Sequence, residues 1–145
     1  MAAEISKRYE PNSIQERWYE YWTTNKLFGV SVDVSKKPFT IMMPPPNVTG
    51  VLHMGHALQD SIQDCLIRYK RMKGYNAHWQ AGKDHAGLAT QNVVEKKLRA
   101  KGINKDDLGR EKFLDEVWKV VEEHRDVITK QKIKIGDSAD WDREK

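Results

Sequence analysis

The chain has 145 residues, of which 39% are hydrophobic and 32% charged, and its formal net charge is +4. This composition is typical of one soluble globular domain and argues against a disordered or membrane protein, because no apolar run approaches the ~20 residues of a membrane-spanning helix. Cys65 is the only cysteine, which excludes an internal disulfide and a cysteine-based zinc cluster. We therefore expect a cytoplasmic protein without a membrane partner.

The first predicted element is a helix over residues 12–29. Ser13 and Glu16 have the spacing of a capping box at its start, and Gly29 is a typical helix stop. Apolar side chains recur at helical spacing and predict a packing face made of Ile14, Trp18, Tyr21 and Trp22. A polar connector, residues 30–37, follows this helix.

A strand–helix–strand unit is predicted next. Residues 38–43 read as a short buried strand, which must end at Pro44 because proline has no N–H to donate. Residues 52–73 have a helical pattern that ends at Gly74, and residues 76–80 form a second strand in which Trp79 is expected to be core. The apolar stripe of the helix consists of Met54, Leu58, Ile62, Cys65, Leu66 and Tyr69.

Two helices complete the predicted elements, over residues 88–100 and 110–132, before a polar tail. The longer one carries an apolar side made of Phe113, Val117, Val120, Val121, His124 and Ile128. The basic run at residues 95–105 reads as a solvated helix end, with a nucleic-acid-facing surface as the alternative. Because a strand–helix–strand order favours parallel strands, the predicted fold is α/β, the first half of a Rossmann-like parallel sheet with flanking helices.

The loops after the two strands are the candidate functional site, because ligands of open α/β sheets bind beyond the carboxyl ends of the strands. Residues 44–46 are three prolines that make a rigid wall. Asn47 and Gly50 supply a turn, and Gly50 also lets a ligand approach the backbone. Residues 81–87 form the second loop.

His53 and His56 lie three residues apart at the start of the helix, with Gly55 between them. A helix N-terminus attracts anions, so imidazoles placed there can donate hydrogen bonds to phosphate. A metal site completed by Asp84 or His85 is one alternative, although a zinc ion takes about three or four protein ligands. The other alternative is a pair of partly exposed histidines without function. The surrounding pattern favours phosphate.

Several strings together carry a family resemblance. HMGH at residues 53–56 resembles the HIGH signature of class I aminoacyl-tRNA synthetases. HxGH alone is shared by many nucleotidyl-transfer enzymes, whereas its combination with PPPNVTG and DHAG-ATQ at this spacing is similar to the valyl-tRNA synthetase family in particular. LGREKFLDEVW and SADWDRE extend the similarity over nearly the whole chain from Tyr9 onward.

The resemblance implies a HIGH-type nucleotidyl-transferase fold and a valine--tRNA ligase activity. Such an enzyme activates L-valine with ATP to valyl-adenylate and transfers it to tRNA(Val), with Mg²⁺ held mainly by the ATP phosphates. The family is expected to be monomeric. His53 and His56 carry over as the catalytic residues, which stabilise charge at the α-phosphate.

The remaining site residues also follow from the resemblance. The ATP-binding set is Thr49, Gly50, His53, Gly55 and His56, and the valine-binding set is Pro44, Pro45, Asn47 and Asp84. Asp84 would bind the valine ammonium, its alternative role being a helix N-cap. Asn47 would assist it, with plain turn chemistry as the alternative.

No KMSKS string occurs in the chain, and the editing and anticodon-binding parts of the family have no counterpart in it. We therefore expect the amino-terminal portion of a catalytic domain. Residues 1–37 would be an N-terminal helix and connector, and residues 38–145 the βαβ nucleotide-binding half with trailing helices. The alternative function is a non-catalytic nucleotide-binding module or an inactive truncated paralogue.

Overall fold

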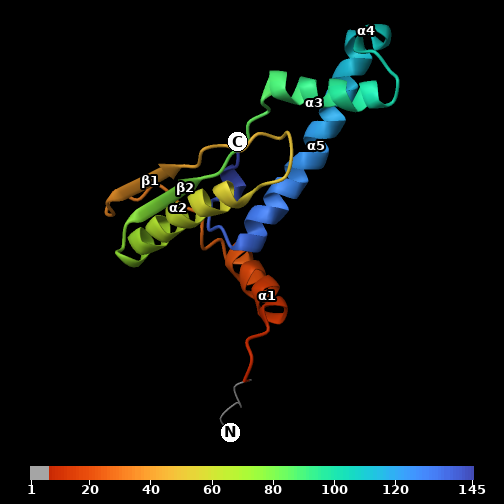
Figure 1. Cartoon of the computed structure of the whole chain (residues 1–145). Coiled ribbons are helices and arrows are strands. Elements are labelled where there is room, and N and C mark those ends of the chain that lie inside the picture. The colour runs from red at the N-terminus through yellow and green to blue at the C-terminus, as the bar shows by residue number, and fades with distance from the viewer. Residues whose placement is uncertain (1–6) are drawn as a thin grey trace.

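The structure, a computed structural model, describes residues 7–145. The two strands and α2 lie together at one end of the molecule, and α5 runs from them to an arm that contains α3 and α4 (Figure 1). The elements in chain order are α1 (Pro11–Thr24), β1 (Pro38–Met42), α2 (Met54–Met72), β2 (Asn76–Gln80), α3 (Gly87–Ala100), α4 (Lys105–Leu108), α5 (Arg110–Ile135) and the 3₁₀ turn η1 (Trp141–Arg143).

β1 and β2 form a parallel pair in the register Pro38↔Asn76 to Met42↔Gln80. The predicted α/β class, the parallel pairing and the bounds of the second strand are therefore confirmed. β1 ends one residue earlier than expected, although Met43 N–H still donates to the Gln80 carbonyl at 3.0 Å before the prolines stop the ladder. Burial of β1 on both faces is wrong, because only one face lies toward α2 and Met42 on the other is 69% exposed.

The segment after α5 was expected to be a polar tail, but residues 137–140 are buried. Gly136 ends α5 in the left-handed region, with φ 89°, and the chain turns back there toward the sheet. Asp140 then forms a parallel bridge with Gln80, and its N–H donates to the Trp79 carbonyl at 3.0 Å. Since successive carbonyls of a strand point to opposite sides, the tail occupies the edge of β2 that β1 leaves open.

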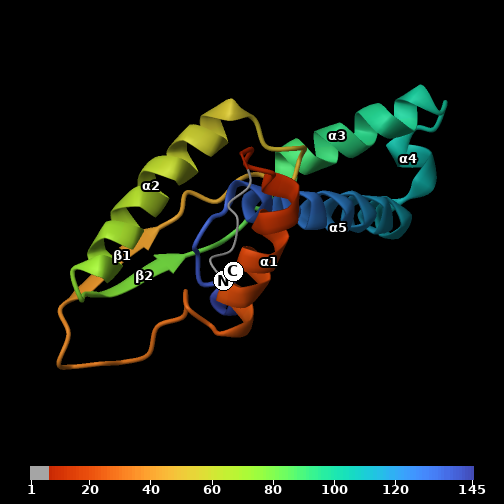
Figure 2. The same ribbon diagram turned by 90° about the horizontal axis from the view of Figure 1, so that it is seen from below.

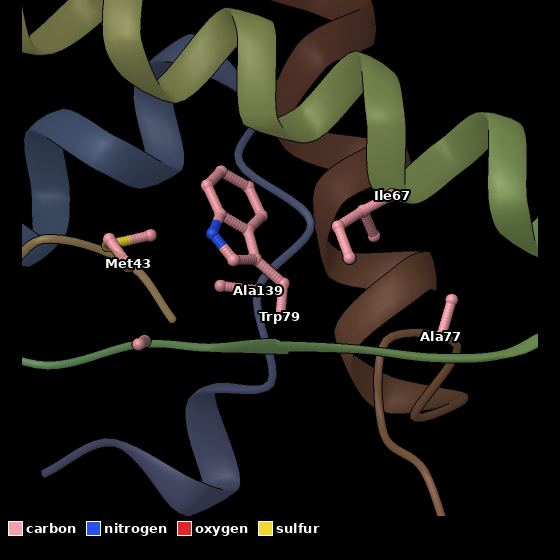
Figure 3. Packing of buried hydrophobic residues seen from close by; sticks show 6 residues of the cluster. Met43, Ile67, Ala77, Trp79 and Ala139 are labelled. Carbon is pink, nitrogen blue, oxygen red and sulfur yellow. The ribbon is translucent and has the colours of Figure 1, made fainter. Parts of the chain in front are cut away.

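The core between the sheet and α2 is built around Trp79, which is fully buried as expected. Ala77 from the same strand and Ile67 from α2 lie beside it, and Met43 and Ala139 close its other sides (Figure 3). Trp79 Nε1–H donates to Gln63 Oε1 at 3.0 Å, so the indole has a partner inside the core.

The apolar stripe expected to pack under α2 is instead exposed, which corrects the sequence prediction. Met54, Leu58, Ile62, Leu66 and Tyr69 are between 47% and 82% exposed, and Cys65 is exposed as well. The buried face of the helix carries Asp60 and Ile67. Polar groups are tolerated there because they have partners. Asp60 pairs with Lys132 of α5 (Arg110–Ile135), and Arg71 donates to Ser138 Oγ at 2.6 Å and to the Ser138 carbonyl at 2.8 Å in the tail.

α1 also differs from its prediction. It begins at Pro11, in the favoured first helical position, and Ser13 lies inside the first turn, so no capping box forms. The helix ends at Thr24 rather than at Gly29. Trp18 and Tyr21 of the expected packing face are exposed. The buried residue is Tyr19, whose hydroxyl donates to the Asp137 carbonyl at 2.7 Å and ties α1 to the tail.

α5 extends three residues beyond its predicted end, and its apolar side is confirmed in outline. Val120, Val121 and Ile128 are buried, and α3 packs on the first half of the helix through Val94 and Leu98. α4 was not predicted; it is a single turn that Asn104 caps. Seen from below, α1 lies across the other end of α5, against the tail (Figure 2). None of the helices in residues 7–145 is long and apolar enough to cross a membrane.

Candidate functional site

The loops that follow β1 and β2 meet, as expected from the carboxyl ends of parallel strands. Asn47 and Asp84 form an isolated parallel bridge. Val48 N–H donates to the Asp84 carbonyl and Asp84 N–H donates to the Pro46 carbonyl, both at 2.9 Å. The two loops are thus joined through their backbones.

α5 packs against the first loop. Val48, 1% exposed, packs against Val121 and Ile128 of that helix. Two residues before α2 begins, Leu52 N–H donates to Gln131 Oε1 at 2.9 Å. The sequence indicated neither contact, since they join residues more than 70 positions apart.

His53 and His56 form a reciprocal capping box at the start of α2. His53 is the N-cap, and its Nδ1 accepts from Gly55 N–H at 3.1 Å. His56 Nδ1 accepts in turn from the His53 N–H at 3.3 Å. A neutral imidazole whose Nδ1 accepts carries its proton on Nε2. The capping geometry therefore selects one tautomer for both rings and leaves each an Nε2–H donor.

This arrangement corrects one detail of the sequence interpretation. The backbone donors at the start of α2 were expected to face an anion, but Gly55 N–H is already bonded to His53. The rings, whose centroids lie 4.1 Å apart, carry the donors instead. Burial, followed by the nearby His53 and the Lys132 cation, lowers the pKa of His56 below its usual value, while Asp60 opposes this. His56 is consequently a neutral donor at pH 7.

A cavity of about 360 Å³ adjoins the histidines. Of the residues assigned from the sequence, its lining includes Pro45, Asn47, Thr49, Gly50, His53 and His56. Pro44, Gly55 and Asp84 are not part of this lining, although the Asn47↔Asp84 bridge places Asp84 at its border. The structure therefore brings most of the assigned residues around one space.

Asp84 does not cap the helix that follows it. The N-cap of α3 is Ala86, which has φ 47°, and Asp84 Oδ1 accepts from the Ala86 N–H at 2.8 Å in a local turn. The side chain is exposed. Within residues 7–145, no hydrogen bond or ion pair engages Oδ2 of Asp84, so this oxygen can accept from a cationic ligand.

Gly55→Ala is expected to displace the His53 ring. A Cβ at this position would lie 3.0 Å from His53 Cε1 and 3.1 Å from Nδ1, so the ring must move, and we expect the cap to open. Losing a cap costs about 1 kcal/mol, and replacing glycine by alanine inside a helix returns a similar amount. We therefore expect little change in the melting temperature. In ¹⁵N imidazole NMR spectra, His53 should no longer show the signal of a ring whose Nδ1 accepts a hydrogen bond.

The matched control is Gly50→Ala, because a Cβ at Gly50 meets no atom within 4 Å. Its His53 signals should match those of the wild type. Unchanged His53 signals in Gly55→Ala would show that the cap tolerates the methyl group and would contradict the prediction.

A buried charge cluster lies one helical turn behind His56, and sequence reasoning missed it. Lys132 Nζ contacts Asp60 Oδ2 at 2.5 Å and lies 3.8 Å from Asp137 Oδ2. All three side chains are at most 3% exposed. The sequence did contain a signal for the burial of Lys132. It follows Ile128 by four residues and therefore lies on the same, buried side of α5. Across residues 7–145, no group of three or more histidine, cysteine or acidic side chains is placed to hold a metal ion.

The sequence was compared with protein families and curated proteins. Residues 17–145 match the family described as tRNA synthetases class I (I, L, M and V). A valine--tRNA ligase of Fusobacterium nucleatum subsp. nucleatum is 54% identical over 142 residues, which are 98% of this chain and 16% of that protein. A valine--tRNA ligase of Thermus thermophilus is 54% identical over 141 residues, 97% of this chain and 16% of its own length. The chain thus spans about one sixth of the length of these relatives.

Among solved structures, the fold resembles the LeuRS-tRNA-LeuAMS ternary complex of Agrobacterium radiobacter K84. The TM-score is 0.77 at 22% sequence identity, and the match covers 95% of this chain and 16% of the other. At this identity the similarity concerns the fold alone. It confirms the predicted half of a Rossmann-like fold with flanking helices.

Proposed function

The chain belongs to the class I tRNA synthetases, and from this premise we propose that it forms the ATP- and valine-binding half-site of a valine--tRNA ligase. The reaction is the condensation of valine with ATP to valyl-adenylate and pyrophosphate, followed by transfer of valine to tRNA(Val). The observation that carries the proposal is the histidine capping box, because it leaves two Nε2–H donors on residues that line one cavity.

Adenylate formation develops negative charge around the α-phosphate as pyrophosphate leaves. Little covalent chemistry is asked of the protein, so catalysis rests on positioned donors that need not reorganise. His53 and His56 suit this role because their Nδ1 atoms are fixed by backbone N–H groups. The lowered pKa of His56 keeps it a neutral donor without competing protonation at Nδ1. Thr49, Gly50 and Gly55 complete the proposed ATP-binding residues.

The proposed valine site lies where the two loops join. Asp84 Oδ2 would accept from the valine ammonium, with Asn47 beside it through the backbone bridge. Pro44 and Pro45 would form the wall that limits the size of the side chain. Mg²⁺ would be held mainly by the ATP phosphates.

In this proposal, residues 38–145 are the βαβ nucleotide-binding half with its trailing helices, and residues 1–37 are an N-terminal helix and connector. The tail supports this division, because it completes the second edge of β2. We also infer that the protein acts in the cytoplasm as a monomeric ligase, where its substrates ATP, valine and tRNA are found.

His53→Ala/His56→Ala is expected to weaken ATP binding and abolish valine-dependent ATP–pyrophosphate exchange by the chain. A hydrogen bond to a charged group contributes about 1.5–3 kcal/mol, so losing two such donors should reduce ATP affinity at least ~100-fold. Isothermal titration with ATP and a pyrophosphate-exchange assay measure the two effects. His124→Ala is the matched control, because this histidine lies on α5, away from the cavity lining, and its ring contacts the Val120 carbonyl of its own helix at 2.7 Å.

The outcomes separate the two functions. Exchange by the wild-type chain, lost in the double variant, supports the ligase half-site. ATP binding that depends on the histidines but without exchange supports a nucleotide-binding module. A folded wild-type chain that binds no ATP contradicts both.

A further inference from the structure

Two consecutive residues of α5 hold the two ends of the segment that carries the histidine pair. Gln131 Oε1 accepts from the Leu52 N–H at 2.9 Å, immediately before the N-cap His53. Lys132 Nζ contacts Asp60 at 2.5 Å, one turn after His56. The capping box is therefore bracketed by two contacts to the same turn of another helix.

The Gln131 contact acts on the backbone of the residue that leads into the cap. Leu52 packs, half-buried, with Val48 and Val121 against α5, so its position is fixed by packing and by this hydrogen bond together. His53 follows with φ −126° and ψ 175°, the extended conformation that an N-cap needs. A shift of the Leu52 backbone would turn the following peptide bond and change the direction of the His53 N–H. His56 Nδ1 accepts its hydrogen bond from that N–H.

Stability alone does not explain a glutamine at this place. One neutral hydrogen bond contributes little net stability, and the rest of the contact is already made by apolar packing on α5. The geometric effect falls on His56, because its Nδ1 accepts from the N–H of His53, the residue that follows Leu52. If the His53 N–H turns away, His56 Nδ1 loses its donor and nothing selects the Nε2–H tautomer.

We propose that Gln131 is a positioning residue of the candidate adenylation site, which holds the backbone of Leu52 so that His56 presents Nε2–H toward the cavity. The inference rests on the proposed function for its purpose, but the placement of the rings can be tested without any ligand. Gln131 itself is absent from the cavity lining and so acts through the backbone of the loop.

The test compares Gln131→Leu with Gln131→Glu in the full chain. Leucine has a similar size and no acceptor, whereas glutamate keeps an oxygen that can accept from Leu52 N–H. In ¹⁵N imidazole NMR spectra, we expect the wild type and Gln131→Glu to show Nε2–H tautomers for His53 and His56. Gln131→Leu should show mixed tautomers for His56, whereas His53 keeps its Nε2–H tautomer because its Nδ1 still accepts from Gly55 N–H. Gln15→Leu, an exposed change on α1, is the control for a loss of glutamine as such.

ATP titration of the same variants separates the inference from the proposed function. Gln131→Leu should bind ATP about 5-fold more weakly, as expected for one lost hydrogen bond that acts indirectly, and Gln131→Glu should restore most of the affinity. Wild-type tautomers in Gln131→Leu would overturn the positioning role, whatever its melting temperature. Mixed tautomers in a series that binds no ATP would uphold the positioning role and overturn the ATP site instead.

Discussion

Lys132→Met is expected to destabilise the fold by about 3–5 kcal/mol, the cost of leaving a buried carboxylate without its counter-ion. Asp60 is 0% exposed, and its contact with Lys132 joins α2 to α5. A domain of this size is stable by only about 5–15 kcal/mol, so the variant would lose a large part of its stability. Urea unfolding at pH 7, followed by circular dichroism, measures the change.

The double variant Lys132→Met/Asp60→Leu distinguishes a lost counter-ion from a lost packing contact. Replacing a buried ion pair by apolar residues of similar volume is often neutral or stabilising, so the double variant should recover most of the loss. Lys130→Met on the exposed side of α5 should change stability by less than about 0.5 kcal/mol. A Lys132→Met chain as stable as the wild type would show that Asp60 and Asp137 satisfy each other without the cation.

Asp137 is expected to make the chain less stable as the pH rises from 4 to 8. Burial, and then the neighbouring Asp60 charge, raise the pKa of Asp137 to about 8 against an ordinary 3.8. Between these values the folded state binds a proton that the unfolded state releases, so the free energy of unfolding falls with pH. The stabilisation that Asp137 contributes is complete below the pKa that it has in the unfolded chain. It is lost as the pH rises through the pKa that Asp137 has in the folded chain. At about 1.4 kcal/mol per pKa unit, a shift from 3.8 to about 8 corresponds to roughly 6 kcal/mol.

Asp137→Asn removes this titration while keeping a neutral side chain of the same shape. The comparison isolates one residue, since all other titrating groups are shared by the two chains. The difference in unfolding free energy between variant and wild type should grow from pH 4 to pH 8, with the variant the more stable at pH 8. Parallel pH profiles of the two chains would mean that Asp137 is ionised in the folded state throughout this range.

The same proton explains a feature of the cluster. Asp60 Oδ1 and Asp137 Oδ2 are buried oxygens without a hydrogen-bond partner in the described part of the chain. A neutral Asp137 carboxyl can donate to Asp60, which would give both oxygens a partner.

The elements with purely local signals were predicted well. β2 has the expected bounds, and the parallel pairing followed from the strand–helix–strand order. Trp79 was correctly expected in the core because large apolar residues of a central strand are rarely left exposed. Helix ends were predicted less well, since α1 begins with Pro11 rather than with a Ser13 cap.

The apolar stripe of α2 shows where periodicity fails. A hydrophobic pattern indicates that a face can be buried, but burial also needs a partner in contact with that face. Here α2 turns Asp60, Asp64 and Arg71 inward, because Lys132 of α5 pairs with Asp60 and the buried tail supplies partners for Asp64 and Arg71, as in the hydrogen bond from Ser138 N–H to Asp64 at 3.1 Å. No local window of the sequence contains both partners.

The sequence by itself determined the two strands, the prolines that stop the first of them, the meeting of two loops at one edge, the histidine pair and the family. These features depend on neighbouring residues or on strings that lie within a few turns of each other. Only the tertiary structure decided which nitrogen of each histidine is free, that Gln131 holds the Leu52 peptide and that Lys132 is paired with Asp60. The histidine capping is local, but the direction of its hydrogen bonds depends on backbone and ring conformations that a sequence pattern does not give. The other two contacts join groups more than 70 residues apart, which the chain brings together only when it folds.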